Sequence, residues 1–170
     1  DTEEFVKLHF DESLFRLSNK AVGKRIAIIG YGSSIDEIQP DWFNDYDILI
    51  GIDYMGSVLN CDYCITDRLE VVSAVINSSK CRIDNMVLPY KLEDKVSGKW
   101  ITNPYKDSIK YSVSDKLLSK YPPFIKGSIE SIALHLAIFM SPNSITLYGY
   151  DFRIVNDISH TKKTIFYNDG

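Results

Sequence analysis

The chain has 170 residues, a formal net charge of −4 and a sequence pI near 5.3. This length is typical of one domain that can bury a sizeable core. With 45% apolar and 25% charged residues, the composition is that of a globular protein, which excludes disordered and collagen-like classes. Because the chain is acidic and has no cluster of lysine or arginine, we expect no nucleic-acid duplex as partner, although a single nucleotide remains open.

Hydropathy and cysteine content bear on the compartment. No apolar run approaches the roughly 18 residues that a membrane-spanning helix needs, so we expect a soluble protein. The three cysteines are too few for a disulfide-stapled secreted domain, which favours a reducing, cytoplasmic compartment. Cys61 and Cys64 have the spacing of metal ligands, but a second pair is missing and we expect no zinc site. The chain begins at Asp1 without a signal-peptide pattern, so we expect a fragment or a processed chain.

Apolar patterning predicts alternating strands and helices. Residues 1–22 have the apolar spacing of an amphipathic helical extension. Residues 25–29 form a short β-branched run, typical of a parallel strand buried on both faces. Further strands are predicted at residues 46–52, 63–66, 86–88 and 144–148, and helices at residues 69–76 and 128–140.

The order of these elements predicts the fold. Periodicity fades over residues 89–123, which we interpret as an irregular, lid-like insertion. Strands that alternate with helices indicate an α/β fold, a Rossmann-like three-layer sandwich with a mostly parallel sheet, in one domain over residues 1–170. Ligands of such sheets bind beyond the carboxyl ends of the strands, which draws attention to Gly30–Ser34, Asp53, Asp67, Tyr150 and Asp151.

A glycine-containing turn follows the first strand. Gly30, Gly32, Ser33 and Ser34 lie between that strand and a helix expected to begin near Ile35. Two glycines let backbone amides approach an anion, and a helix N-terminus attracts one; the alternative is a plain turn with Ser34 as N-cap. The dinucleotide fingerprint is incomplete because Ile35 occupies its third glycine position. Asp53 stands where a ribose-binding acid would, which keeps a nicotinamide site as an alternative.

Other candidate residues come from separate stretches of chain. Asp53 and Asp67 both follow strands, so they can face one crevice and bind sugar hydroxyls or a divalent metal, or can each cap a helix. Gly127 and Ser128 open the strongest helix and offer free amides there, or Ser128 is a plain N-cap. His160 lies in a polar segment where an imidazole can take a proton from a hydroxyl, or it is a surface histidine. We expect His135, within the apolar helix, to be a core residue.

The order of these motifs resembles the bacterial sialyltransferases of glycosyltransferase family 42. The resemblance covers roughly residues 24–160, and it is carried by residues 30–37, Asp53, residues 126–137 and residues 145–152. The flagellin-modifying Maf proteins and the archaeal pterin pyrophosphokinase-like proteins are similar too, and their strand-end acids match Asp53 and Asp67 better.

The resemblance implies an enzyme that moves a sugar from a CMP-linked donor to a glycan hydroxyl in the synthesis of bacterial cell-surface polysaccharide or lipo-oligosaccharide. His160 would be the general base, and the family needs neither a metal nor another cofactor. Tyrosine hydroxyls stabilise the departing phosphate in this family, and Tyr105, Tyr111, Tyr121 and Tyr150 are available. The implied donor-binding residues are Gly30, Gly32, Ser33, Ser34, Asp53, Asp67, Gly127, Ser128, Tyr150 and Asp151.

Two other functions stay open. The sialyltransferases usually place asparagine where this chain has Asp53 and Asp67, and a carboxylate repels a donor phosphate unless a cation or a sugar hydroxyl intervenes. One alternative is therefore a pyrophosphokinase-like phosphotransferase with Mg²⁺ at the two aspartates. The other is a nucleotide- or sugar-binding module without catalysis. The location implied is the cytoplasm or the periphery of the inner membrane, and an oligomer is compatible with the sequence.

Overall fold

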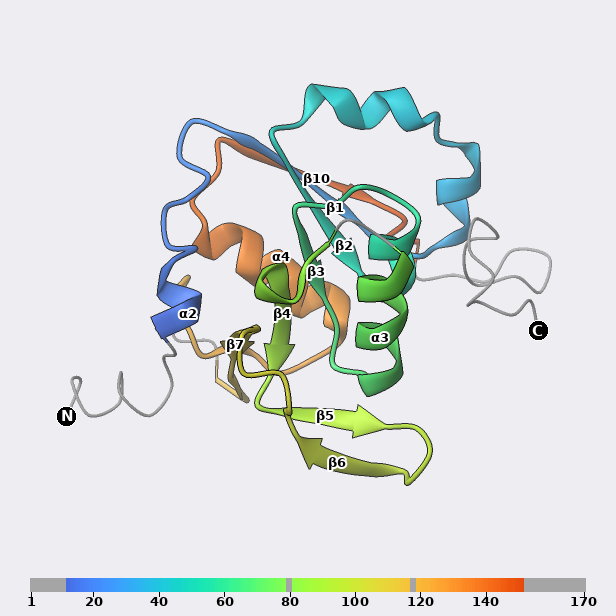
Figure 1. Ribbon diagram of the computed structural model, residues 1–170. Helices are drawn as coiled ribbons and strands as arrows, with labels where there is room; N and C mark the ends of the chain where they lie inside the picture. Colours follow the sequence, from blue (N-terminus) through green and yellow to red (C-terminus); the bar gives the residue numbers. More distant parts are fainter. Residues whose placement is uncertain (1–11, 79–80, 117–118, 152–170) are drawn as a thin grey trace.

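The computed structural model describes residues 12–78, 81–116 and 119–151, and within them it has an α/β fold built on one central sheet (Figure 1). The sheet has six strands in the order β10-β1-β2-β3-β4-β7, and every neighbouring pair is parallel. The strands are β1 Arg25–Ile29, β2 Ile48–Ile52, β3 Tyr63–Ile65, β4 Met86–Pro89, β7 Ile109–Tyr111 and β10 Ser144–Tyr148. The predicted Rossmann-like sandwich is confirmed.

Two layers of helices cover the sheet, which is why its strands are apolar on both faces. Alternate residues of β1 face opposite layers: Ile26 and Ile28 pack with α4 (Ile129–Phe139), and Ala27 and Ile29 pack with the short helices after β1 and β2. α3 (Leu69–Ser78) covers β3 and β4 on the face opposite α4 (Figure 1). On the α4 side, Leu14 and Leu17 anchor α2 (Glu12–Phe15) and the turn that follows it.

The segment 89–123 is more regular than predicted. It contains the antiparallel hairpin of β5 (Lys91–Asp94) and β6 (Lys99–Thr102), the sheet strand β7, and β8 (Val113–Ser114), which pairs with β9 (Phe124–Ile125). The prediction of irregular structure was therefore wrong for the hairpin, β7 and β8, and the lid-like role of the segment stays a prediction. Its strands are two to four residues long, too short for apolar periodicity to register, and in the hairpin only Leu92 is fully buried.

The remaining predictions of secondary structure are confirmed in part. Ser128 is the N-cap of α4, accepting a hydrogen bond from the Ser131 amide, as one predicted alternative has it. The helix expected near Ile35 is instead a 3₁₀ helix, η1 (Ser33–Glu37), with Gly32 rather than Ser34 at the N-cap position. Of the predicted N-terminal helix, residues 1–11 lie outside the described residues. In the part of the chain that is described, no helix has the length and apolarity to cross a membrane.

Candidate functional site at the carboxyl edge of the sheet

The turn after β1 uses its amides within the protein. The Gly30 amide donates to the Tyr148 carbonyl (2.7 Å), and the Gly32 amide donates to the Gly149 carbonyl (2.9 Å). The Ser34 amide donates to Oδ2 of Asp151 at 2.8 Å, and the Ser34 hydroxyl donates to Oδ1 of the same carboxylate at 2.5 Å. The anion that occupies this turn is thus the chain's own Asp151.

Close packing explains the two glycines of the turn. A Cβ atom at Gly32 would stand 2.5 Å from both the Gly149 carbonyl oxygen and Oδ2 of Asp151, and one at Gly30 would stand 2.9 Å from that carbonyl. The residues therefore have to be glycine so that the ends of β1 and β10 can approach each other. Their predicted contact with a nucleotide stays a prediction, and their amides have another role in this arrangement.

Asp53 is the most buried acid at the carboxyl edge. It begins η3 (Asp53–Ser57) directly after β2, is 5% exposed, and has a φ of 50°, in the left-handed region that few residues other than glycine adopt. Its Oδ1 accepts a hydrogen bond from the Thr66 hydroxyl (2.7 Å), and its Oδ2 lies 3.3 Å from a guanidinium nitrogen of Arg68. Thr66 and Arg68, which follow β3, thus hold the carboxylate of Asp53, which follows β2.

Burial dominates the acidity of this group. Removal from water raises the pKa of Asp53 from 3.8 to about 6, against the opposing effects of the Arg68 charge and the Thr66 hydrogen bond. Asp67 also follows β3, and burial raises the pKa of its carboxyl as well. The structure therefore brings both predicted strand-end acids to one edge of the sheet.

Arg68 belongs to the candidate site, although the sequence pattern did not single it out. Its guanidinium lies beside Asp53, 3.8 Å from a carboxylate oxygen of Glu70, and 5.5 Å from the ring centroid of Tyr54, while a third of its side chain stays exposed. The available signal was its place directly after the strand-end acid Asp67. Arg68 places a positive charge at the exposed rim of this acidic edge, where it can bind an anion.

The start of α4 meets the same edge. The Tyr31 side chain forms a hydrogen bond with Glu130, in the first turn of α4, and the Tyr150 hydroxyl donates to the Glu130 carbonyl at 3.0 Å. Burial raises the pKa of both tyrosines, with the negative charge of Glu130 adding to it, and that charge also raises the pKa of Asp53. The ends of β1, β2, β3 and β10 and the start of α4 therefore converge, as the strand-end rule predicts.

Tyr111 has a buried hydroxyl without a hydrogen-bond partner among the described residues. Tyr111 is the last residue of β7 and is 1% exposed. Burial raises the pKa of its hydroxyl, and the nearby charges of Asp67 and Asp53 raise it further. A buried polar atom without a partner is unusual in a folded protein and marks a place where a water or a ligand atom fits. Among the four tyrosines that the sequence offered for contact with the phosphate, Tyr111 is the one whose buried hydroxyl has no hydrogen-bond partner among the described residues.

Gly127 and Ser128 open α4 as predicted, but the Ser128 side chain is engaged in the helix cap. Its hydroxyl accepts from the Ser131 amide at 3.3 Å and lies 3.0 Å from the Ser131 hydroxyl. A Cβ at Gly127 would meet nothing closer than 3.8 Å, so packing does not require glycine there. The predicted contacts of both residues with a donor stay predictions.

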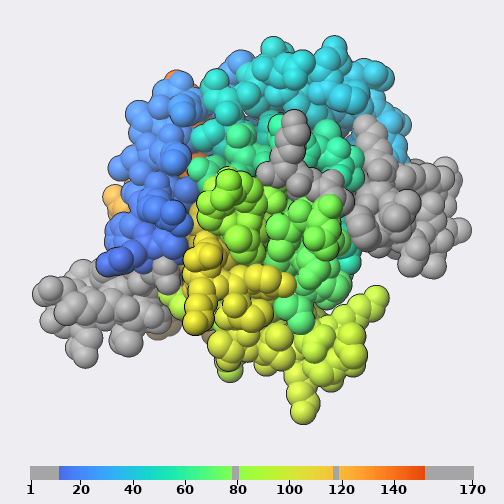
Figure 2. All heavy atoms as spheres, viewed as in Figure 1, coloured from blue at the N-terminus to red at the C-terminus, as the bar shows by residue number. Residues whose placement is uncertain are grey.

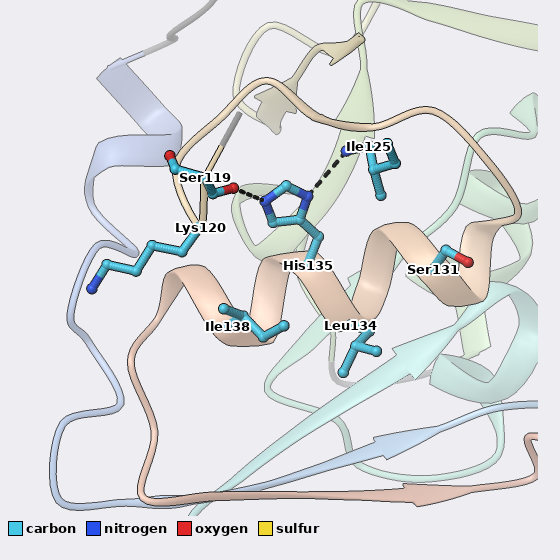
Figure 3. A pocket seen from close by; sticks show the side chains of 7 residues that line it. All are labelled: Ser119, Lys120, Ile125, Ser131, Leu134, His135 and Ile138. Atoms are coloured by element: carbon cyan, nitrogen blue, oxygen red, sulfur yellow. Dashed lines mark hydrogen bonds between the residues drawn. The ribbon is translucent and has the colours of Figure 1, made fainter. Parts of the chain in front are cut away.

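The histidines divide between the described and the undescribed parts of the chain. His160, the predicted general base, lies outside the described residues. His135 is buried, as predicted: its Nδ1 accepts from the Ile125 amide (3.0 Å), and its Nε2 lies 3.1 Å from the Ser119 carbonyl (Figure 3). It borders a pocket of about 460 Å³ between α4 and the segment that leads to β9. With both ring nitrogens bonded to backbone, His135 has a structural role.

The three cysteines lie together beneath α3. All are free and buried, and hydrogen bonds with Cys61 and Cys81, together with burial, raise the pKa of the Cys64 thiol well above its usual value. Within residues 12–78, 81–116 and 119–151, no group of three or more histidine, cysteine or acidic side chains has an arrangement that holds a metal.

Comparisons of the chain with protein-family models, curated proteins and solved structures find no match.

Proposed function

We propose that the chain is a glycosyltransferase of the sialyltransferase type, which moves a sugar from a CMP-linked donor to a glycan hydroxyl in the synthesis of bacterial cell-surface polysaccharide. The observation that carries the proposal is the buried Asp53, held by Thr66 and Arg68 at the carboxyl edge of a parallel sheet. Ligands of such sheets bind at this edge. Ribose and sugar hydroxyls donate well to fixed carboxylates, and the cationic Arg68 suits the donor phosphate.

The charges of the edge fit a donor rich in hydroxyls that carries one phosphate. Asp53, Asp67 and Glu130 offer acceptor oxygens to hydroxyls, and the positive charge of Arg68, 3.3 Å from the Asp53 carboxylate, offsets part of the repulsion between that carboxylate and the phosphate. Transfer would proceed by attack of an acceptor hydroxyl on the anomeric carbon as the bond to the CMP phosphate breaks. The acceptor proton passes to a base, for which His160 is the candidate, and the phosphate leaves with the bonding electrons.

A pyrophosphokinase-like site with Mg²⁺ at the two aspartates fits these residues less well. Asp53 accepts the Thr66 hydroxyl on one oxygen and pairs with Arg68 on the other, so a metal ion at Asp53 would stand beside a guanidinium of the same sign. Asp67, the other proposed ligand, is followed directly by that arginine. The acids of this edge therefore suit hydroxyls better than a divalent cation.

A thermal-shift titration tests the proposal. CMP at a hundred times its Kd should stabilise the protein by about 2.7 kcal/mol, a rise in Tm of about 5–10 °C, and EDTA should not reduce it. Arg68→Ala should lose most of this shift. Stabilisation by ATP that depends on Mg²⁺, without any by CMP, would replace the proposal by the phosphotransferase alternative. Stabilisation by CMP without release of CMP from a CMP-sugar would leave only a binding module.

A charge-neutralising pair of variants sharpens the test. Asp53→Asn removes the carboxylate that would accept the ribose hydroxyls and keeps an oxygen for Thr66, so it should weaken CMP binding at pH 7.5. The matched control is Asp47→Asn, because Asp47 lies at the opposite end of β2, where Oδ2 accepts from the Arg25 amide. Unchanged or tighter CMP binding in Asp53→Asn, or the same change in both variants, would count against placing the nucleotide at this edge.

A further inference from the structure

The β5-β6 hairpin carries exposed aromatic rings at the same edge of the sheet. Trp100 on β6 is 53% exposed, and Tyr90, just before β5, is 43% exposed. They line a pocket of about 300 Å³, together with Pro89, Lys91, Tyr111 and Val113. Figure 2 shows the hairpin projecting from the lower edge of the molecule. Large aromatic side chains exposed beside a pocket, rather than scattered singly, are typical of binding sites.

The hairpin has one face for the core and one for the pocket. Leu92 and Ile101 are a cross-strand pair, and both pack against the cluster of apolar residues around α3. Since side chains alternate along a strand, the neighbouring pair of Glu93 and Trp100 faces the other way. Trp100 is therefore not needed for packing beneath the hairpin, and its exposure has no structural explanation.

Backbone contacts connect the hairpin to the candidate site. The Glu93 amide, directly across the hairpin from Trp100, donates to the Asp67 carbonyl at 2.8 Å, and Glu93 also forms a β-bridge with Arg68. Tyr111 also lines the pocket, and it lies within electrostatic reach of Asp67. A ligand packed on Trp100 would thus lie near Glu93, whose backbone amide bonds to the strand-end acid Asp67.

We infer that the pocket between Trp100 and Tyr90 binds one sugar of the acceptor glycan and directs its neighbouring hydroxyl toward the strand-end acids. The inference rests on the proposed function, for which it supplies the acceptor subsite. Sugar rings have apolar C–H faces that pack on indole and phenol rings, and hydroxyl rims that bond to charged side chains such as Lys91 and Glu93. A volume of about 300 Å³, at the lower end for ligand pockets, suits a small ring rather than a protein segment.

The second tryptophan offers a matched control. Trp42 lies on η2 (Pro40–Asp45), is 48% exposed, and lines no part of the pocket. Because the sequence has two tryptophans, Trp42→Phe leaves Trp100 as the sole indole reporter. A glycan that packs on Trp100 should then shift or quench the remaining fluorescence.

The experiment combines glycan binding with steady-state kinetics. An array of galactose-, glucose- and N-acetylglucosamine-ended oligosaccharides is probed with the wild type, Trp100→Ala and Trp42→Ala. We expect binding by the wild type and Trp42→Ala, its loss in Trp100→Ala, and a fluorescence change in Trp42→Phe with the bound glycan. With that glycan as acceptor, Trp100→Ala should raise the acceptor KM at least tenfold, whereas the thermal shift by CMP should be retained.

The outcomes separate the two proposals. Binding of no glycan by the wild type, equal binding by Trp100→Ala, or an unchanged acceptor KM would overturn the acceptor subsite, and the CMP shift would still stand for the donor site. Absence of a CMP shift in the wild type would instead overturn the proposed function. Misfolding of Trp100→Ala would show as a lower Tm without ligand. In that case Trp100→Phe, which keeps an aromatic ring, replaces it and should bind the same glycans more weakly than the wild type. Equal binding by Trp100→Phe and the wild type would overturn the subsite.

Discussion

The sharpest prediction concerns Asp53, whose substitution by asparagine should change how stability depends on pH. Asparagine has nearly the same shape and keeps an oxygen for the Thr66 hydroxyl, but it cannot ionise. In the wild type, burial raises the pKa of Asp53 from 3.8 to about 6, so the folded protein holds this proton up to a higher pH than the unfolded chain. Ionisation of Asp53 therefore destabilises the folded state as pH rises.

The size of the effect follows from the two pKa values. Below pH 3.8 the carboxyl is protonated in both states, and above pH 6 it is ionised in both, so the loss of stability develops between these values. At about 1.4 kcal/mol per pKa unit, the whole shift corresponds to about 3 kcal/mol. About 2 kcal/mol of this loss should fall between pH 4.5 and pH 7.5, mostly below pH 6.5.

Urea denaturation of the wild type and Asp53→Asn at several pH values measures this loss. The free energy of unfolding of the wild type, minus that of the variant, should decrease by about 2 kcal/mol from pH 4.5 to pH 7.5. Thr66→Val removes a hydrogen bond that favours the ionised form, so it should move the midpoint of the decrease to higher pH. A difference that is flat with pH, or that increases, would refute the account of Asp53 as a carboxyl whose pKa burial has raised.

Three further predictions concern other residues. Tyr111→Phe should leave the free energy of unfolding unchanged or raise it by about 1 kcal/mol, because the buried hydroxyl has no partner among the described residues; a loss above 1 kcal/mol would reveal a partner. Ser128→Ala should destabilise the protein by about 1 kcal/mol by removing the N-cap of α4, and no change in urea denaturation would contradict the cap. Cys61, Cys64 and Cys81 should react with Ellman's reagent only after denaturation, and rapid reaction of the native protein would show that the thiols are accessible.

The elements that could be predicted from the sequence are those in which buried apolar residues recur over several positions. β1, with four of its five residues buried, and α4, with an apolar sequence and a serine N-cap, lie where their patterns place them. β7 has three residues, and it joins the sheet through its pairing with β4, a contact that no local pattern reveals. The structural role of the glycines in the turn after β1 could not be predicted for a similar reason, since they serve the approach of Gly149 and Asp151 from the far end of the chain.

The same distinction applies to the candidate site. Asp53 and Asp67 were predicted at one edge because the carboxyl ends of parallel strands meet there. Arg68, Tyr31 and Glu130 were missed, since their roles depend on which charge or hydroxyl stands opposite in three dimensions. The catalytic assignment of His160 stays a prediction from the family resemblance.

The central claim, that a CMP-linked sugar binds at this edge, is tested most directly by a crystal structure of the protein with CMP. We predict the phosphate within hydrogen-bonding distance of the Arg68 guanidinium and the ribose hydroxyls against carboxylates at the ends of β2 and β3. A nucleotide bound elsewhere, such as in the pocket beside His135, or no nucleotide at saturating concentration, would contradict the account.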